Sequence, residues 1–178
     1  YIIGFEESCG YLVGAHARDK DAVVASMLIC EMTAYYKLQG KTLINILDEM
    51  SKEFGMFLHK VLSFSFEGAE GMAKMAKIME DLRDNMPIQI GGNKVKMYAD
   101  YETGMMKNID TDEVETIKLP KSNVLSYKML GGTGVIVRPS GTEPKIKIYI
   151  TACGHSREDA AAIEKALETD VKKILGIE

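Results

Sequence analysis

Apolar and polar residues alternate strictly along two stretches of the chain. In KIKIYI, residues 145–150, isoleucine occupies every second position, and Lys145, Lys147 and Tyr149 stand between. In the segment FLHKVLSFSFEG, residues 57–68, Val61, Ser63 and Ser65 alternate with Leu62, Phe64 and Phe66. A period of two is typical of a β-strand that has one buried face. We therefore expect two strands whose apolar faces pack on helices.

Two helices are predicted in the first third of the chain. Either Asp19 or Asp21 can cap the N-terminus of the first helix, and Gly40 can end it. Apolar residues cover most sides of this helix, so we expect it to be buried on more than one face. Thr42 is the predicted N-cap of the second helix, which Gly55 ends.

Two more helices are predicted in the second half. Residues 70–85 place methionine and leucine at helical spacing, and Pro87 blocks any continuation. The final helix begins at Ser156, where Asp159 three residues on forms a weaker version of the capping box. Between these helices, residues 88–130 hold several short extended pieces that are separated by glycine-containing turns.

This order of elements predicts an α+β chain in two parts. The apolar run of residues 1–5 reads as a strand and, with two helices, forms the strand-helix-helix tail of an α/β domain, because these elements cannot make a sheet alone. The rest predicts a small antiparallel sheet with two helices. We place the first part at residues 1–56 and the second at 57–178. The chain opens at Tyr1 without an initiator methionine, so we expect that it continues a longer protein.

The composition narrows the functional classes. No apolar run approaches the ~18 residues of a membrane span, and the formal net charge of −4 argues against nucleic-acid binding. Cys9, Cys30 and Cys153 fit neither a disulfide framework nor a zinc site. We therefore expect a cytoplasmic protein with no nucleic-acid or membrane partner.

The most informative segment is VIVRPSGTEPKIKIYI, residues 135–150. Arg138, Ser140, Gly141 and Thr142 crowd into the loop between two apolar strands, with a proline on each side. Backbone N–H groups, hydroxyls and a forked guanidinium suit a phosphate or a carboxylate. The alternative is a tight hairpin that carries one surface arginine.

At this point the sequence resembles a known family. RPSGTEPKIKIY is similar to the phosphate-binding loop in the C-terminal domain of the α-D-phosphohexomutases, the phosphoglucomutase/phosphomannomutase family. GFEESCGY resembles that family's sugar-binding loop, KDA at residues 20–22 resembles the motif that opens the next helix, and LPKSNVLSY is also similar to family sequences. The resemblance covers nearly the whole chain in the family's order. It implies a TBP-like fold for the C-terminal domain and places residues 1–56 at the end of the third domain.

The resemblance also implies roles for single residues. Glu6 and Ser8 match the residues that meet sugar hydroxyls, and Lys20 matches a lysine near the reacting end. Cys9 stands where the family often has glycine. The substrate phosphate would be held by five residues of the hairpin: Arg138, Ser140, Gly141, Thr142 and Lys147.

The implied activity of the intact protein is the interconversion of hexose 1-phosphate and hexose 6-phosphate. Family members use an enzyme phosphoserine, a glucose 1,6-bisphosphate-type intermediate and Mg²⁺ held by another domain. This chain has no Ser-His-Asn nucleophile segment and no Asp-Gly-Asp-x-Asp metal segment. We therefore expect no catalytic or metal-binding residue here. The expected partners are the hexose phosphate and the missing N-terminal domains, without which we expect the chain to be inactive. The alternative function is a stand-alone, non-catalytic module that binds phosphate or other anions.

Overall fold

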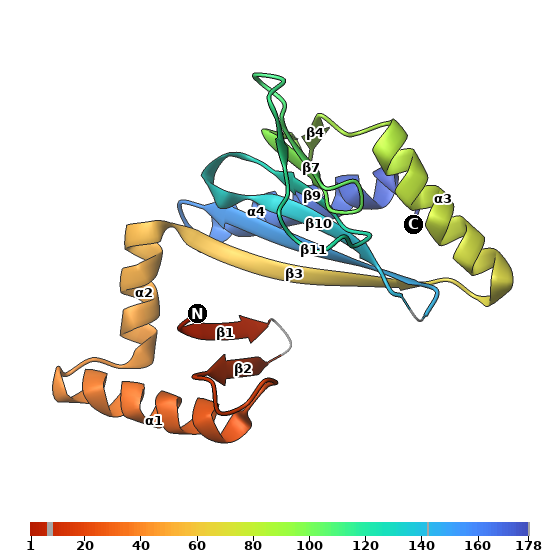
Figure 1. Ribbon diagram of the computed structural model, residues 1–178. Helices are drawn as coiled ribbons and strands as arrows, with labels where there is room; N and C mark the ends of the chain where they lie inside the picture. The colour runs from red at the N-terminus through yellow and green to blue at the C-terminus, as the bar shows by residue number, and fades with distance from the viewer. Residues whose placement is uncertain (7–8, 142, 178) are drawn as a thin grey trace. The chain divides into compact units, whose positions relative to one another are not determined.

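The structure, a computed structural model, describes residues 1–6, 9–141 and 143–177 (Figure 1). The chain divides into two compact units, Tyr1–Glu53 and Phe54–Glu178. Both combine helices with antiparallel strands, which confirms the predicted α+β class. In the described part of the chain, no helix has the length and apolar character needed to cross a membrane.

The first unit holds a hairpin and two helices: β1 (Ile3–Glu6), β2 (Gly10–Val13), α1 (Ala22–Leu38) and α2 (Leu43–Phe54). The hairpin is a difference from the single strand predicted here. Cys9 has a φ of 63°, in the left-handed region that turns a chain sharply, and the next residues return along β1. As a result, Glu6 lies opposite Gly10 in the antiparallel register.

The predicted caps place the starts of both helices. The Asp21 carboxylate accepts hydrogen bonds from the backbone N–H groups of Val23 and Val24, at 2.9 and 3.1 Å, so Asp21 rather than Asp19 begins α1. The Thr42 hydroxyl accepts from the backbone N–H of Asn45 at 3.2 Å, as expected of an N-cap.

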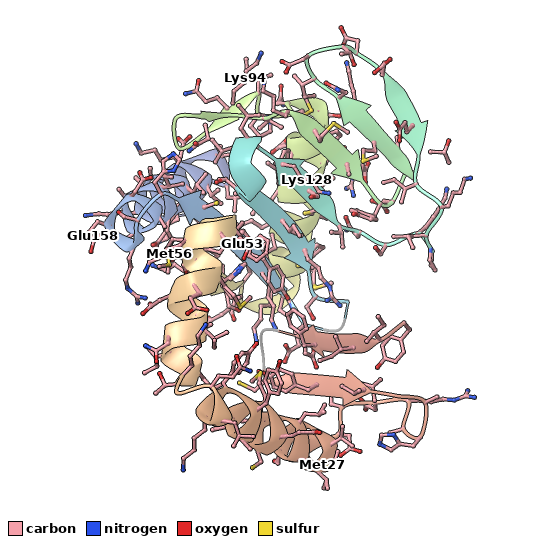
Figure 2. The ribbon with its side chains drawn as sticks, turned by 90° about the vertical axis from the view of Figure 1, so that its left-hand side faces the viewer. Met27, Glu53, Met56, Lys94, Lys128 and Glu158 are labelled. Atoms are coloured by element: carbon pink, nitrogen blue, oxygen red, sulfur yellow. The ribbon has the colours of Figure 1, made fainter. Side chains whose placement is uncertain are left out.

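The described residues of α1 and α2 include no buried residue. The sequence predicts burial of α1 on more than one face, but the described part of this unit offers α1 a single two-stranded hairpin and α2 to pack on. Met27, labelled in Figure 2, is 59% exposed. The apolar surface of the helix is therefore largely uncovered.

The second unit is built on a seven-stranded antiparallel sheet in the order β3-β11-β10-β9-β6-β7-β8. Glu53 and Met56, labelled in Figure 2, flank the passage from α2 into β3. The elements are β3 (Met56–Ser65), α3 (Gly68–Asp84), β4 (Gln89–Ile90), β5 (Asn93–Lys94), β6 (Met97–Asp100), β7 (Met105–Asn108), β8 (Val114–Thr116), β9 (Leu125–Lys128), a 3₁₀ turn (Leu130–Gly132), β10 (Gly134–Pro139), β11 (Lys145–Gly154) and α4 (Arg157–Ile174).

Helices α3 and α4 share one hydrophobic core with the central strands (Figure 1). The isoleucines of β11 are at most 1% exposed, and they belong to the same cluster as Met79 of α3 and Leu167 of α4. The alternation predicted for residues 145–150 is thereby confirmed. The intervening residues lie on the opposite face of the sheet, here called the outer face: Ser63 of β3, Arg138 of β10, and Lys145, Lys147 and Tyr149 of β11.

The start of α4 has the predicted cap. The Ser156 hydroxyl accepts from the backbone N–H of Asp159 at 3.1 Å, and the Asp159 carboxylate accepts from the backbone N–H of His155 at 2.9 Å. Just before this cap, Gly154 ends β11 against the helix. A Cβ added at Gly154 would lie 2.5 Å from the backbone nitrogen of Ala160, so the close approach of β11 and α4 requires glycine there.

A buried carboxylate on strand β6 pairs with an arginine in the last turn of α3. Asp100 is 4% exposed and accepts a hydrogen bond at 3.1 Å from the Nε of Arg83, which also pairs with Glu102 at 2.6 Å. Burial raises the pKa of Asp100, but hydrogen bonds from Arg83 and the Glu102 N–H outweigh it, so the pKa lies below its ordinary value. Asp100 is therefore ionised at neutral pH.

Candidate functional site

The predicted phosphate-binding residues gather at one end of the hairpin formed by β10 and β11. Arg138 lies directly opposite Lys147, and Lys147 lies directly opposite Ser63 on the neighbouring strand β3. The three side chains therefore form a row across three strands of the outer face. Arg138 and Lys147 are exposed to solvent. The register thus places two cations and one hydroxyl side by side.

This pair of cations has no ion-pair partner in the part of the chain that the structure describes. Neither Arg138 nor Lys147 forms an ion pair with a described carboxylate. Like charges directly opposite each other on a sheet face are destabilising. An anion bound between them would offset that repulsion, so this row favours an anionic ligand.

Backbone hydrogen bonds shape the loop that joins the two strands. The Ser140 N–H donates to the Lys145 carbonyl at 2.7 Å, and the Glu143 N–H donates to the Ser140 hydroxyl oxygen at 3.3 Å. The Pro144 carbonyl accepts from the N–H of Phe66 at 2.8 Å, which ties the loop to the end of β3. These bonds hold the loop beside the cations.

Two further predicted residues belong to this loop. A Cβ built on Gly141 would have no described atom within 4 Å, so a ligand can approach the backbone there. Thr142 lies outside the described residues. The structure thus brings Arg138, Ser140 and Lys147 together with Gly141.

In the other unit, the predicted sugar-binding residues Glu6 and Lys20 form an ion pair at 3.0 Å. Lys20 also pairs with Asp19 at 3.3 Å. Both side chains close over Gly10, where an added Cβ would lie 2.3 Å from the Lys20 Cδ and 2.5 Å from the Glu6 Oε1. They line an open depression of about 610 Å³. Ser8 lies outside the described residues.

These exposed charges stabilise one another. Hydrogen bonding to Glu6 and then to Asp19 raises the pKa of Lys20, and the pKa of Asp19 is lowered in return. The pKa of Asp21 is lowered mainly by its hydrogen bond to His16, whose Nε2 lies 2.8 Å from the carboxylate. The unit thus presents a compact charged group at the start of α1.

From the sequence, no binding role is assigned to three charged residues that lie beside the predicted site residues. Asp19 is predicted only as a possible helix cap, and its adjacency to Lys20 is the signal for their ion pair. Glu143 and Lys145 are the others, and their side chains pair at 3.3 Å beside the predicted phosphate-binding residues. Their separation by two positions in a tight loop was the available signal.

The side chains that the structure describes form no cluster suited to a metal ion. Among the described residues, no group of three or more His, Cys, Asp or Glu side chains could hold one.

The fold belongs to the α+β structural class, and comparison with models of known protein families identifies the family. The model of the phosphoglucomutase/phosphomannomutase alpha/beta/alpha domain III matches residues 1–54, and that of the family's C-terminal domain matches residues 66–170. The chain therefore belongs to the phosphoglucomutase/phosphomannomutase family, which confirms the resemblance seen in the sequence.

Individual relatives agree with this assignment. A phosphoglucomutase of Staphylococcus epidermidis is 39% identical over 168 residues, which cover 94% of this chain and 31% of the relative. A phosphoglucomutase of Staphylococcus aureus is 41% identical over 161 residues, which cover 90% of this chain and 29% of the relative. The chain thus spans less than a third of the length of these curated relatives.

A solved structure shares the fold. The open form of parafusin, an exocytosis-sensitive phosphoprotein and phosphoglucomutase from Paramecium, superposes with a TM-score of 0.64 at 18% sequence identity. The match covers 96% of this chain and 29% of the parafusin chain. The prediction of the fold from the resemblance is therefore confirmed.

Proposed function

We propose that this chain supplies the sugar-binding and phosphate-binding parts of a phosphohexomutase that interconverts hexose 1-phosphate and hexose 6-phosphate. The observation that carries the proposal is the row of Arg138 and Lys147, two opposed cations with no described carboxylate partner. Residues 1–56 would be the last piece of the third domain, and residues 57–178 the fourth domain. Family membership and the phosphoglucomutase relatives support both assignments.

The proposed grip holds the phosphate through charge. The Arg138 guanidinium offers a fork of donors to phosphate oxygens, while Lys147 adds a point charge beside it. Ser140 and the backbone near Gly141 complete the set, and Thr142 is included on the resemblance alone. Each charge-assisted hydrogen bond contributes ~1.5–3 kcal/mol, so a few of them hold a phosphate despite its desolvation.

The sugar would meet the depression lined by Glu6 and Lys20. A carboxylate accepts hydrogen bonds from vicinal hydroxyls, and an ammonium donates to them. The Glu6–Lys20 ion pair holds both side chains over Gly10. Ser8 is proposed as a further hydroxyl contact from the sequence resemblance.

The reaction itself needs groups from elsewhere in the protein. In the proposed mechanism, an enzyme phosphoserine gives its phosphoryl group to the sugar, and the bisphosphate turns over and returns its other phosphate. A grip that accepts either phosphate of the turned sugar must recognise charge rather than one sugar face. Positioning and electrostatics dominate phosphoryl transfer, and this chain contributes those effects. We expect no mutase activity from the chain alone.

Calorimetric titration of this chain with glucose 6-phosphate tests the proposal. Substitution of Arg138→Ala removes one or two charge-assisted bonds and is expected to weaken binding by ~2–4 kcal/mol. The matched control is Arg157→Ala, which removes an exposed arginine at the start of α4 and leaves the affinity unchanged. Equal affinity of the wild type and Arg138→Ala for glucose 6-phosphate would refute the assigned grip.

The same titration separates the enzyme from the alternative anion-binding module. A mutase fragment uses the sugar hydroxyls as well as the phosphate, so glucose 6-phosphate should bind more tightly than inorganic phosphate, and Glu6→Gln should reduce that difference. Equal binding of the two ligands in the wild type would favour the module.

A further inference from the structure

The phosphate-binding hairpin contains one acidic residue. Between Arg138 and Lys147 the sequence is RPSGTEPKIK, so Glu143 is the sole carboxylate of the segment. A carboxylate beside a site for a dianion competes for the same cations and repels the ligand. The hairpin must therefore keep Glu143 away from Arg138 and Lys147.

Lys145 contacts this carboxylate. Its Nζ lies 3.3 Å from the Glu143 Oε2, and its backbone N–H donates to the Glu143 carbonyl at 2.7 Å. Lys145 and Glu143 are thus joined through both side chain and backbone. The Glu143 N–H in turn donates to the hydroxyl oxygen of Ser140 at 3.3 Å. The position of Glu143 is therefore linked to a residue of the grip.

The register explains why Lys145 is suited to this task. Lys145 lies on the same face of β11 as Lys147, two residues nearer the loop, and it lies opposite Ser65 of β3. Its side chain is 31% exposed, whereas that of Glu143 is 62% exposed. Lys145 therefore lies between the loop and Lys147 along β11, and its ammonium pairs with the Glu143 carboxylate.

We propose that Lys145 is a positioning residue, which holds the Glu143 carboxylate away from the phosphate grip and so raises the affinity for a sugar phosphate. This inference rests on the proposed function of Arg138 and Lys147. It differs from the simpler idea that Lys145 binds the phosphate itself, because its ammonium is already paired with Glu143.

The size of the effect follows from electrostatics. A released carboxylate at about 7 Å from a phosphate dianion, in a water-like dielectric, weakens binding by about sevenfold. Substitution of Lys145→Met removes the charge and retains the length of the side chain, so we expect this loss of affinity for glucose 6-phosphate. The conservative variant Lys145→Arg retains the pair and should bind as the wild type does.

A double-mutant cycle is the decisive test. In a Glu143→Gln background there is no carboxylate to hold, so Lys145→Met should lose only the direct attraction of one ammonium for the phosphate and should cost clearly less affinity for glucose 6-phosphate than it does when Glu143 is present. Affinities are measured by calorimetry on the 178-residue chain at low ionic strength, with ¹H–¹⁵N spectra to confirm that each variant is folded.

Each result supports or overturns the inference. A loss of affinity that is clearly larger in the wild-type background than in the Glu143→Gln background supports it. An equal loss in both backgrounds shows that Lys145 acts on the phosphate only through its own charge, and it overturns the inference while the grip stands. No loss in either background also overturns it. Failure of the proposed function itself is recognised separately, because Arg138→Ala then has no effect on binding.

Discussion

Arg138 and Lys147 place two positive charges opposite each other on neighbouring strands. We therefore predict that removing one of them will raise the stability of the free protein and lower its affinity for a sugar phosphate. Lys147→Met removes one of the two charges that face each other across β10 and β11 and keeps a side chain of similar length. In the absence of phosphate, the loss of a like-charge pair is expected to stabilise the second unit by ~0.2–1 kcal/mol.

With ligand present, the order of stabilities reverses. Glucose 6-phosphate at about ten times its Kd stabilises the wild type by about 1.4 kcal/mol. Loss of one charge-assisted bond raises the Kd about tenfold, so the same ligand concentration stabilises Lys147→Met by only about 0.4 kcal/mol. The difference of about 1 kcal/mol exceeds a central gain of about 0.5 kcal/mol in the ligand-free variant.

The assay is urea unfolding followed through amide signals of β11, with and without glucose 6-phosphate. Lys128→Met is the matched control, because Lys128 is an exposed lysine at the end of β9, labelled in Figure 2, and lies outside the cation row. This control should respond to the ligand as the wild type does. If Lys147→Met is destabilised without ligand, or gains as much from ligand as the wild type, the reasoning from the opposed cations fails.

Two other predictions concern single groups. Asp100→Asn should destabilise the second unit by ~2–3 kcal/mol at neutral pH. The folded pKa of Asp100 is lowered, so its stabilising effect is fully present above the ordinary pKa of 3.8 and is lost as the pH falls through the folded pKa. The stability deficit of the variant in urea unfolding should therefore shrink in acid. A deficit that is constant with pH would contradict the assigned pair with Arg83. Cys9→Gly should stabilise the first unit by ~0.5–1 kcal/mol, because the φ of 63° favours glycine; slower amide exchange in β1 and β2 checks this, and faster exchange counts against it.

The strand β11 and the helix starts could be predicted because residues close together in the sequence determine them. The alternation along β11 reports one buried face, and Asp21, Thr42 and Ser156 satisfy the orphan N–H groups of helix starts within three residues. The residue types in the loop after Arg138 likewise pointed to an anion without knowledge of the fold.

Features that depend on distant pairing could not be predicted. The row of Ser63, Lys147 and Arg138 exists only because β3 pairs with β11 in one register, and no local signal fixes that register. The contact of Arg83 with Asp100 joins a helix to a strand in the same way. The return of the chain into β2 was missed because it depends on the left-handed backbone at Cys9, a residue type that rarely marks a turn.

The central claim is that the Arg138 guanidinium binds the phosphate of a sugar phosphate, and NMR observation of its Nε–H group tests this most directly. The account predicts that this signal shifts on addition of glucose 6-phosphate, saturates with the calorimetric Kd, and does not move with glucose. A signal that is unchanged at saturating glucose 6-phosphate, or that moves equally with glucose, would contradict it.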